Sequence, residues 1–324
     1  TASLYQLQAF TEALLAETET AYWLYALATR RIEIFQESLD IARRQREEVQ
    51  DRIEIGVLPE TERASADAEV AQREQDLIDA RARRDTLRLR LLRLISGDPD
   101  GRLDRDVIIR TEPDTRPTPL TDLEDRIELA LRERPDLNEA RLLLEEARLE
   151  TIVTRNGLLP RLDFFVTLGK TGFADDLAES FRDLDGPTFD LAAGLEFAYP
   201  IDNRAAAGRD RAARLSRRRA AASIENLMQL IRRDVRVAAV EVERAREQIA
   251  ASASTRQLRE EVLRAEEERF RVGDSTSLLV AQAQRDLLES RIAEVDAVVA
   301  FRVALISLYL EEGTLLARRG LVVE

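Results

Sequence analysis

Two glycines interrupt long helical patterns in the same way in two distant parts of the chain. The first stands at the end of Arg52-Ile53-Glu54-Ile55-Gly56 and the second at the end of Arg269-Phe270-Arg271-Val272-Gly273. After each glycine, a short polar stretch leads into another long helical pattern, which ends near Gly97 in one copy and near Gly313 in the other. A unit of this length exceeds the roughly 20–50 residues of a solenoid repeat. The pattern therefore predicts a duplicated helical hairpin.

The composition is typical of long helices rather than of a thick globular core. Charged residues make up 34% of the 324 residues and aromatic residues only 5%, while glycine (12) and proline (9) are both scarce. Helices that pack through narrow apolar seams have this balance, because most of their surface stays in water.

The charge and the missing residue types exclude several classes of function. The net charge of −13 argues against nucleic acid as a partner, since phosphate binding needs a basic face. We interpret the run Arg217-Arg218-Arg219 as the solvated face of a helix, because no aromatic residues interleave with it. The chain has no cysteine and no histidine, which excludes disulfides, thiolate metal sites and histidine-based catalysis. Catalysis by carboxylates alone is the alternative that remains, but no acidic pair lies in an evident pocket-forming context. We therefore expect no enzymatic activity, no catalytic residue, no metal site and no cofactor.

Residues 4–54 and 60–96 are predicted to form the two helices of the first hairpin. Apolar residues recur in both at 4-3-4 spacing, the heptad pattern that makes helices wrap around one another. Gly56 and Pro59 break the pattern between the two helices. The seam positions are Ala28, Ile32, Phe35, Leu39, Ala42, Val49 and Ile53 in the first helix and Ala66, Val70, Leu77, Ala80, Leu87, Leu91 and Leu94 in the second.

The second hairpin is predicted around Gly273, from helices at 203–272 and 278–312. Its longer helix would extend about 100 Å at 1.5 Å per residue. Upstream, residues 98–120 are polar and proline-rich and predict an irregular connector. A short helix at 121–133 follows it, and after Arg134-Pro135-Asp136 a further helix extends to about residue 157. The seam of the last helix is Leu288, Ile292, Val295, Val299 and Ile306.

Between these helices the hydrophobic period changes to two, over residues 161–169 and 188–199. Leu162, Phe164, Val166 and Leu168 alternate with Asp163, Phe165, Thr167 and Gly169, and the second segment alternates in the same way. Each segment has about the ten residues of a tilted transmembrane strand. The alternative is a soluble hairpin with one buried face. A lone hairpin is marginal in water, so the membrane interpretation is favoured, with the polar residues between the strands as a long external loop.

Several segments, taken in order, resemble the TolC-like outer membrane factors. Arg134-Pro135-Asp136-Leu137 and Leu158-Leu159-Pro160-Arg161-Leu162 resemble the helix that leads into the first strand of a repeat in that family. Pro200-Ile201-Asp202-Asn203-Arg204 resembles its strand-to-helix junction. Arg269-Phe270-Arg271-Val272-Gly273, with Leu278-Leu279-Val280-Ala281-Gln282-Ala283 downstream, resembles its periplasmic tip.

The resemblance implies a mainly α fold with a small β part. Long antiparallel α-helical hairpins would form an α-barrel tunnel, and the strands would contribute a hairpin to a transmembrane β-barrel, in a trimer. The implied domains are residues 1–97 (first-repeat hairpin), 98–134 (equatorial connector), 135–160 (helix of the second repeat), 161–200 (strand pair with external loop), 201–312 (second-repeat hairpin) and 313–324 (C-terminal equatorial tail).

The chain departs from the family pattern in its first repeat. The second repeat is complete, whereas the first lacks its leading helix and strand pair. An open barrel edge in lipid would leave backbone groups unpaired at a cost of several kcal/mol each. We therefore expect the natural protein to have more N-terminal sequence than this chain.

The function that the resemblance implies is that of a passive exit duct. It would conduct substrates across the periplasm and outer membrane of a Gram-negative bacterium, within a tripartite efflux pump or type I secretion system. Its partners would be two further copies of itself, a periplasmic adaptor (membrane fusion) protein, an inner-membrane transporter and outer membrane lipid, with no nucleic acid. The alternative is a soluble periplasmic coiled-coil scaffold or the adaptor protein itself.

The hairpin tips are the predicted docking sites for the adaptor. Each tip glycine lets the chain reverse where a side chain would obstruct it, and this turning role alone is the alternative explanation of the two glycines. The predicted docking residues are Arg52, Ile55, Gly56, Val57, Leu58 and Thr61 at the first tip and Arg269, Val272, Gly273, Asp274 and Ser275 at the second.

A pore gate is predicted beside the tips. Relatives close this end with tyrosine, arginine and aspartate contacts, but this chain has Phe270 and Ser275 at the tyrosine and arginine positions. Leu279 and Gln282 stand where aspartate rings would be, and Glu62 alone keeps a carboxylate, for which an ordinary solvated helix position is the alternative. We therefore expect a closed end held mainly by apolar contacts from Phe270 and Leu279, which would be poorly cation-selective.

Overall fold

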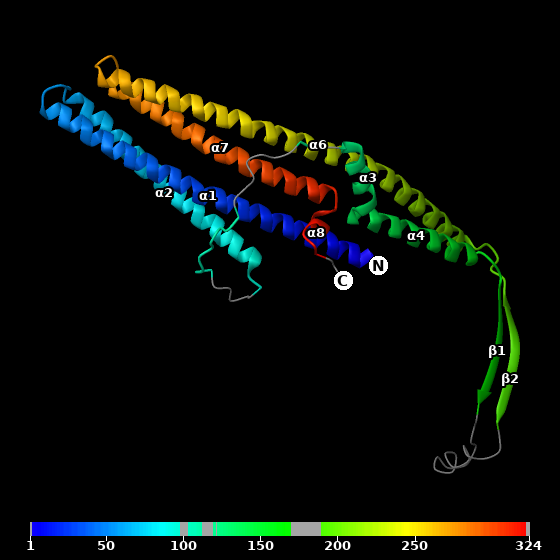
Figure 1. The fold of residues 1–324 in the computed structure, drawn as a ribbon. Coiled ribbons are helices and arrows are strands. Elements are labelled where there is room, and N and C mark those ends of the chain that lie inside the picture. The colour runs from blue at the N-terminus through cyan, green and yellow to red at the C-terminus, as the bar shows by residue number, and fades with distance from the viewer. Residues whose placement is uncertain (1, 98–102, 112–118, 121, 170–188, 322–324) are drawn as a thin grey trace, which may run out of the picture. The chain divides into compact units, whose positions relative to one another are not determined.

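The computed structural model describes residues 2–97, 103–111, 119–120, 122–169 and 189–321. The described residues are mainly helical with one strand pair, which confirms the predicted fold class (Figure 1). The chain divides into two compact units, one made of Thr1–Glu139 with Leu227–Glu324 and the other of Ala140–Asn226. The whole of the predicted external loop, residues 170–187, and the prolines at 99, 113 and 117 lie outside the described residues.

The first hairpin consists of α1 (Ala2–Glu54) and α2 (Thr61–Ile95). Leu39 and Ala42 of α1 are buried against Val70 and Leu77 of α2, so the predicted heptad seam is the core of this pair. The ends of both helices agree with the prediction to within two residues. The apolar period therefore determined this hairpin.

The second hairpin consists of α6 (Arg204–Arg271) and α7 (Ser277–Glu311). In the first unit, α7 packs beside α1 as well as beside α6 (Figure 1). Arg256 of α6 binds Glu294 of α7 at 2.6 Å, and Arg291 of α7 binds Glu37 of α1 at 3.2 Å. Because α7 has neighbours on two sides, it buries apolar residues around much of its circumference, including Val298 and Val299.

At the end of the first unit away from the hairpin turns, α3 (Leu123–Glu133) is followed directly by α4 (Pro135–Asn156). The chain between α7 and the short helix α8 (Leu315–Arg318) crosses the junction of these two helices. Gly313 has φ +66°, and a Cβ placed on it would lie 2.9 Å from the Cα of Arg134. Arg134 also binds Glu311 at 2.7 Å. Glu312 is fully buried and receives hydrogen bonds from Arg126 and from Arg318. Neither α8 nor this contact was predicted.

The two helix-ending glycines that the repeat suggests are not equivalent. Gly313 follows α7 in a left-handed conformation and packs against Arg134. By contrast, α2 ends at Ile95 with Ser96 as an extended C-cap, and Gly97 is not among the residues with positive φ. The repeat therefore extends to the tips but not to the far ends of the hairpins.

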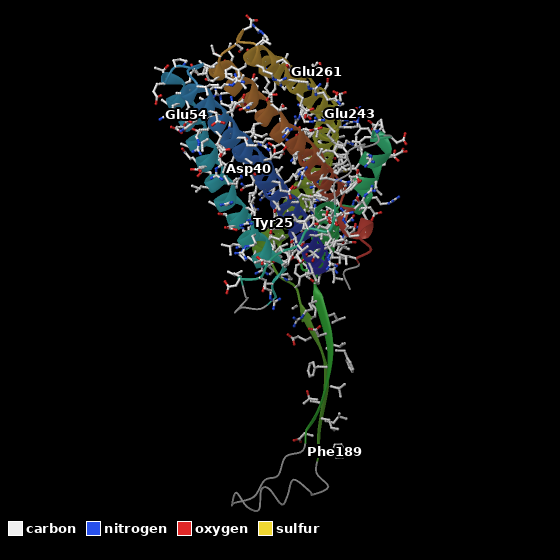
Figure 2. All side chains as sticks on the ribbon, turned by 60° about the vertical axis from the view of Figure 1, so that its left-hand side comes forward. Tyr25, Asp40, Glu54, Phe189, Glu243 and Glu261 are labelled. Atoms are coloured by element: carbon white, nitrogen blue, oxygen red, sulfur yellow. The ribbon has the colours of Figure 1, made fainter. Side chains whose placement is uncertain are left out.

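The strands of the second unit are β1 (Arg161–Gly169) and β2 (Asp190–Ala198), paired antiparallel. The register places the predicted apolar set on one face, since Leu162 is opposite Phe197 and Phe164 is opposite Leu195. The other face carries Asp163 opposite Glu196, and the Phe165 ring lies over Gly194. The pair thus has one continuous apolar face and one mixed face, both exposed to solvent in the described residues (Figure 2).

Candidate docking end of the helical hairpins

The two tips have the same backbone geometry. Gly56 has φ +76° and Gly273 has φ +83°. At the first tip, the Val57 N–H donates to the Arg52 carbonyl at 2.9 Å and the Gly56 N–H donates to the Ile53 carbonyl at 2.9 Å. Asp274 and Gly273 make the equivalent pair of bonds to Arg269 and Phe270 at 2.8 and 3.2 Å. Both helices therefore end in a Schellman motif, in which a left-handed glycine satisfies the last carbonyls.

Large apolar side chains are exposed at both turns. Ile55 and Val57 are 74% and 64% exposed, and Val272 is 77% exposed. A Cβ placed on either tip glycine would meet nothing within 4 Å. The glycines are thus required by the left-handed backbone and not by close packing, and the turns present apolar surface to solvent.

The second turn also has a defined helix start. The Thr276 hydroxyl accepts a hydrogen bond from the Leu279 N–H at 3.4 Å and caps α7. Ser275 donates to Glu266 of α6, and Arg269 binds Glu266 at 3.3 Å. The cap supplies one of the partners that the first amides of a helix lack. Two predicted docking residues, Arg269 of α6 and Ser275 of the turn, therefore share one carboxylate, that of Glu266.

The structure brings the two tips together. The Arg52 guanidinium lies over the Phe270 ring, 4.9 Å from its centroid, within the range of a cation–π interaction. The Ser277 hydroxyl of α7 donates to the Glu62 carboxylate of α2. Each hairpin thus contributes one residue to each of two contacts, and the tips form one end of the unit. Glu54 of α1 and Glu261 of α6 lie toward that end in Figure 2.

Farther from the turns, a partly buried network of charged side chains also joins the two hairpins. Arg285 of α7 binds Glu69 of α2 at 2.8 Å. Glu69 also accepts a hydrogen bond from Arg73, and Arg73 reaches Asp76 at 3.4 Å. Because Arg73 is buried, removing either carboxylate would leave its charge poorly compensated, which is costly.

A small cavity of about 270 Å³ opens between α1, α6 and α7 beside the tips. It is bordered by Phe270, by the arginines Arg44, Arg52 and Arg271 and by the acidic residues Glu48 and Glu267. The pKa of the Glu267 carboxyl is raised, chiefly because burial partly withdraws it from water; the attraction of Arg271 opposes this shift, and repulsion by Glu48 and Glu268 adds to it. The cavity beside the arginine–aromatic contact therefore carries both arginine and glutamate side chains.

The predicted gate residues do not share one environment. Phe270 is buried under Arg52, whereas Leu279 and Gln282 are exposed. Glu62 is half-buried and hydrogen-bonded to Ser277. Within a single chain, the contacts next to the tips are therefore polar and cation–π as well as apolar.

Sequence reasoning missed the partners across the two hairpins. Arg52 and Phe270, Glu62 and Ser277, and Glu69 and Arg285 are each more than 200 positions apart. Periodicity shows which face of a helix is buried but not which residue of a distant helix is opposite. One local signal was available: Thr276 directly precedes an apolar helical pattern, which is typical of an N-cap residue.

Comparison with known proteins identifies a family for this chain. A family model described as outer membrane efflux protein matches residues 126–313, more than half of the chain. No curated protein matches the chain in sequence. Among the described residues, no helix is both long enough and apolar enough to cross a membrane, and no cluster of three or more potential metal-ligating side chains is found.

Solved structures with a similar fold include three bacterial membrane proteins. A membrane protein from Pseudomonas aeruginosa is 21% identical with a TM-score of 0.84, over 96% of this chain and 71% of that chain. The Campylobacter jejuni CmeC outer membrane channel is 18% identical with a TM-score of 0.79, over 97% of this chain and 65% of that one. The Neisseria gonorrhoeae MtrE outer membrane channel, in its open state, is 22% identical with a TM-score of 0.74, over 96% and 68%. At these identities the likeness concerns the fold, and the chain spans about two thirds of the length of these proteins.

Proposed function

Because the chain belongs to the outer membrane efflux protein family, we propose that it forms the exit duct of a tripartite efflux pump or a type I secretion system in a Gram-negative bacterium. The observation that carries the proposal is the common end formed by the two hairpin tips. Two turns with the same left-handed geometry, joined by Arg52 and Phe270, present exposed apolar residues at one place. Family membership favours this role over that of a soluble scaffold or an adaptor protein.

The strand pair supports attachment to the outer membrane. Its face of Leu162, Phe164, Leu195 and Phe197 is fully apolar and exposed. Exposing such a face to water costs about 25 cal/mol per Å², and inserting it into lipid removes this cost. The nine residues of each strand are close to the length that a tilted membrane strand needs.

Closure of the duct requires more than one copy of the chain. The first unit has four long helical segments side by side, from α1, α2, α6 and α7, and such a layer cannot enclose a channel by itself. A homotrimer would provide twelve segments around a polar lumen. Substrates would pass by diffusion, with no chemistry at any residue, and an inner-membrane transporter would supply the energy.

The tips are the proposed docking site for the periplasmic adaptor. Ile55, Val57 and Val272 supply apolar contact area, and Thr61 and Asp274 are exposed polar neighbours. A small apolar cluster with polar surroundings is the arrangement of many protein interfaces. The remaining residues of this site are Arg52, Gly56, Leu58, Arg269, Gly273 and Ser275.

The gate of the closed duct is proposed at the same end. Leu279 and Gln282 project from the first turns of α7 and are exposed. Phe270, covered by Arg52, would contribute by fixing α6 to α1, and Glu62 by holding Ser277 at the start of α7. Such a constriction closes sterically, and without a ring of carboxylates it should be poorly cation-selective.

Export from living cells tests the duct and its docking end. The protein is produced in a Gram-negative host that lacks its own exit duct but retains a matching pump, and efflux of a fluorescent dye is followed. The unmodified protein should restore efflux. Val272→Asp should abolish efflux while cross-linking still detects trimers, because a charge on the tip disrupts an apolar contact.

Arg232→Gln is the control, since Arg232 is exposed on α6 away from the tip, and it should restore efflux fully. Failure of the unmodified protein to conduct ions in planar bilayers would contradict the duct. Unchanged efflux with Val272→Asp would contradict the docking role of the tip.

A further inference from the structure

The start of α6 carries an unusual concentration of positive charge. Residues 204–219 contain seven arginines and one acidic residue, Asp210, in a chain whose net charge is −13. A helix N-terminus favours anions, because its free N–H groups and the helix dipole are positive there. The first turn of α6 nevertheless contains no acidic residue. The segment therefore has an electrostatic cost that a bound anion would offset.

Most of these arginines lack an acidic partner within the second unit. Arg204 pairs with Asp202 at 2.9 Å and Arg214 pairs with Asp210 at 2.7 Å. Arg209 and Arg211 form no ion pair among the described residues, and both are exposed. The same is true of the run Arg217-Arg218-Arg219. These guanidinium groups are available to an external anion.

Arg209 and Arg211 leave the helix on opposite flanks at nearly the same height. Asp210, between them, is buried, and successive residues of an α-helix are rotated by about 100°. The two side chains therefore emerge to either side of the packed face. This spread is lateral, across the helix, which suits a plane of anions better than a single deep site.

The arginines follow directly on the apolar strands. β2 ends at Ala198, Tyr199 is exposed and Ile201 is 88% exposed, and α6 begins at Arg204. Arg155 at the end of α4 is exposed at the other connection to the strands. In membrane proteins, aromatic residues mark the interface and basic residues lie just beyond it. Sequence and structure thus place a basic segment where lipid headgroups would be if the strands enter lipid.

We propose that Arg204, Arg209 and Arg211, here named the arginine collar, bind the phosphate headgroups of anionic phospholipids in the periplasmic leaflet of the outer membrane. The proposal rests on the proposed function, because that function places the strands in the membrane. Guanidinium groups bind phosphate oxygens through two parallel hydrogen bonds. Basic segments beside a membrane-spanning element attract anionic lipid, and the effect falls off within a Debye length of about 8 Å at physiological salt.

The position of the collar therefore determines which arginines contribute. Arg209 and Arg211 follow Arg204 by five and seven residues, which places them about 8–10 Å from it along the helix axis. Arg217-Arg218-Arg219 are about 20 Å along it, beyond the range of strong attraction. The collar is thus the first two turns of α6 rather than the whole basic segment.

The test compares lipid binding by two double variants of equal charge. Arg209→Gln with Arg211→Gln removes two of the three collar charges, and Arg232→Gln with Arg264→Gln removes two exposed charges farther along α6. Each purified protein is reconstituted into vesicles of phosphatidylethanolamine alone or with one quarter phosphatidylglycerol. Lipids that remain bound are then counted by native mass spectrometry, and their affinity is measured by titration in neutral detergent.

The unmodified protein should retain phosphatidylglycerol selectively, and the collar variant should bind it roughly 10- to 30-fold more weakly, as expected for two basic residues at a membrane surface. The distal variant should bind like the unmodified protein. Raising the salt concentration should remove the difference, and millimolar inorganic phosphate should not compete.

Equal loss in both double variants, or no preference for phosphatidylglycerol, would overturn the collar. Competition by inorganic phosphate at the same concentration as lipid would also overturn it, since the site would then bind any phosphate. Insertion and ion conduction are measured in the same vesicles. A protein that conducts without lipid preference refutes the collar alone, whereas a protein that enters neither type of vesicle refutes both the collar and the duct.

Discussion

The guanidinium of Arg52 lies over the ring of Phe270, 4.9 Å from the ring centroid, and joins the last turn of α1 to the last turn of α6. The two residues occupy neighbouring places in the repeat, since Arg52 is four positions before Gly56 and Phe270 is three positions before Gly273. Their contact therefore connects the two copies of the hairpin at nearly equivalent points. Phe270 is buried as a result, whereas most of the tip around it is exposed.

The Arg52–Phe270 contact should couple the stabilities of the two tips. Arg52→Gln and Phe270→Leu should each speed amide hydrogen exchange at both tips, because each removes the same cation–π interaction. Combined, they should cost about 0.5–1 kcal/mol less than the sum of the single changes. Hydrogen exchange read by mass spectrometry over residues 50–58 and 268–276 measures this. Additive effects would show that the tips open independently.

Replacing either tip glycine by alanine should destabilise the protein through the backbone alone. A side chain at Gly56 or Gly273 has free space but must adopt positive φ, which costs about 1–2 kcal/mol. Asparagine should cost less than alanine, because it tolerates the left-handed region. The melting temperature of each variant measures the effect.

Gly208→Ala is the matched control for the tip glycines. Gly208 lies inside α6, also has free space around it, and has no positive φ. Alanine should there stabilise the helix by up to about 1 kcal/mol. The change in stability at Gly208 should thus be opposite in sign to the change at the tip glycines. Equal losses of stability at all three positions would contradict the explanation.

Gly313→Ala should be more damaging than Gly56→Ala. Both positions have positive φ, but the new Cβ at 313 would lie 2.9 Å from the Cα of Arg134. Backbone cannot move aside as a side chain can, so the α3–α4 junction would shift at an additional cost of about 1–3 kcal/mol. Melting temperatures of the two variants, compared at one protein concentration, check the order. A smaller loss at Gly313 would show that the junction is free to move.

Stability should decrease as the pH rises through the titration of Glu12. This side chain is 2% exposed, and burial raises the pKa of its carboxyl to about 7, against opposing effects of Gln8, Arg134 and the Leu316 backbone. The neutral acid is the form that the folded state prefers. Its contribution is therefore complete below about pH 4.5, the unfolded value, and is lost as the pH rises to about 7,.

The pKa shift of Glu12 sets the size of this change in stability, and a substitution at Glu12 tests it. A shift from 4.5 to about 7 corresponds to about 3 kcal/mol,. Glu12→Gln should remove this part of the pH dependence, because the amide stays neutral at every pH. Unfolding of both proteins at pH 5 and pH 8 measures the difference. An identical pH dependence in the variant would show that Glu12 does not control it.

The sequence by itself determined the long helices and the strands, and which of them are joined as hairpins. Heptad spacing at Leu39, Val70 and Leu77 predicted the first hairpin because helix packing buries one stripe per helix. Alternation from Leu162 to Leu168 predicted the strand face because successive side chains point to opposite sides. Gly56 and Gly273 predicted the turns because few other residues adopt their backbone conformation. These are local properties, and one short window of residues is enough to show each of them.

Only the tertiary structure decided which residues of distant segments contact one another. The contact of Arg52 with Phe270, the bond of Ser277 to Glu62 and the approach of Gly313 to Arg134 each join segments far apart in the chain. Such contacts depend on how whole helices are aligned, and a small shift between helices replaces every partner while leaving the apolar period unchanged. The different ends at Gly97 and Gly313 have the same cause: the two copies share a local pattern, but only Gly313 packs against the α3–α4 junction.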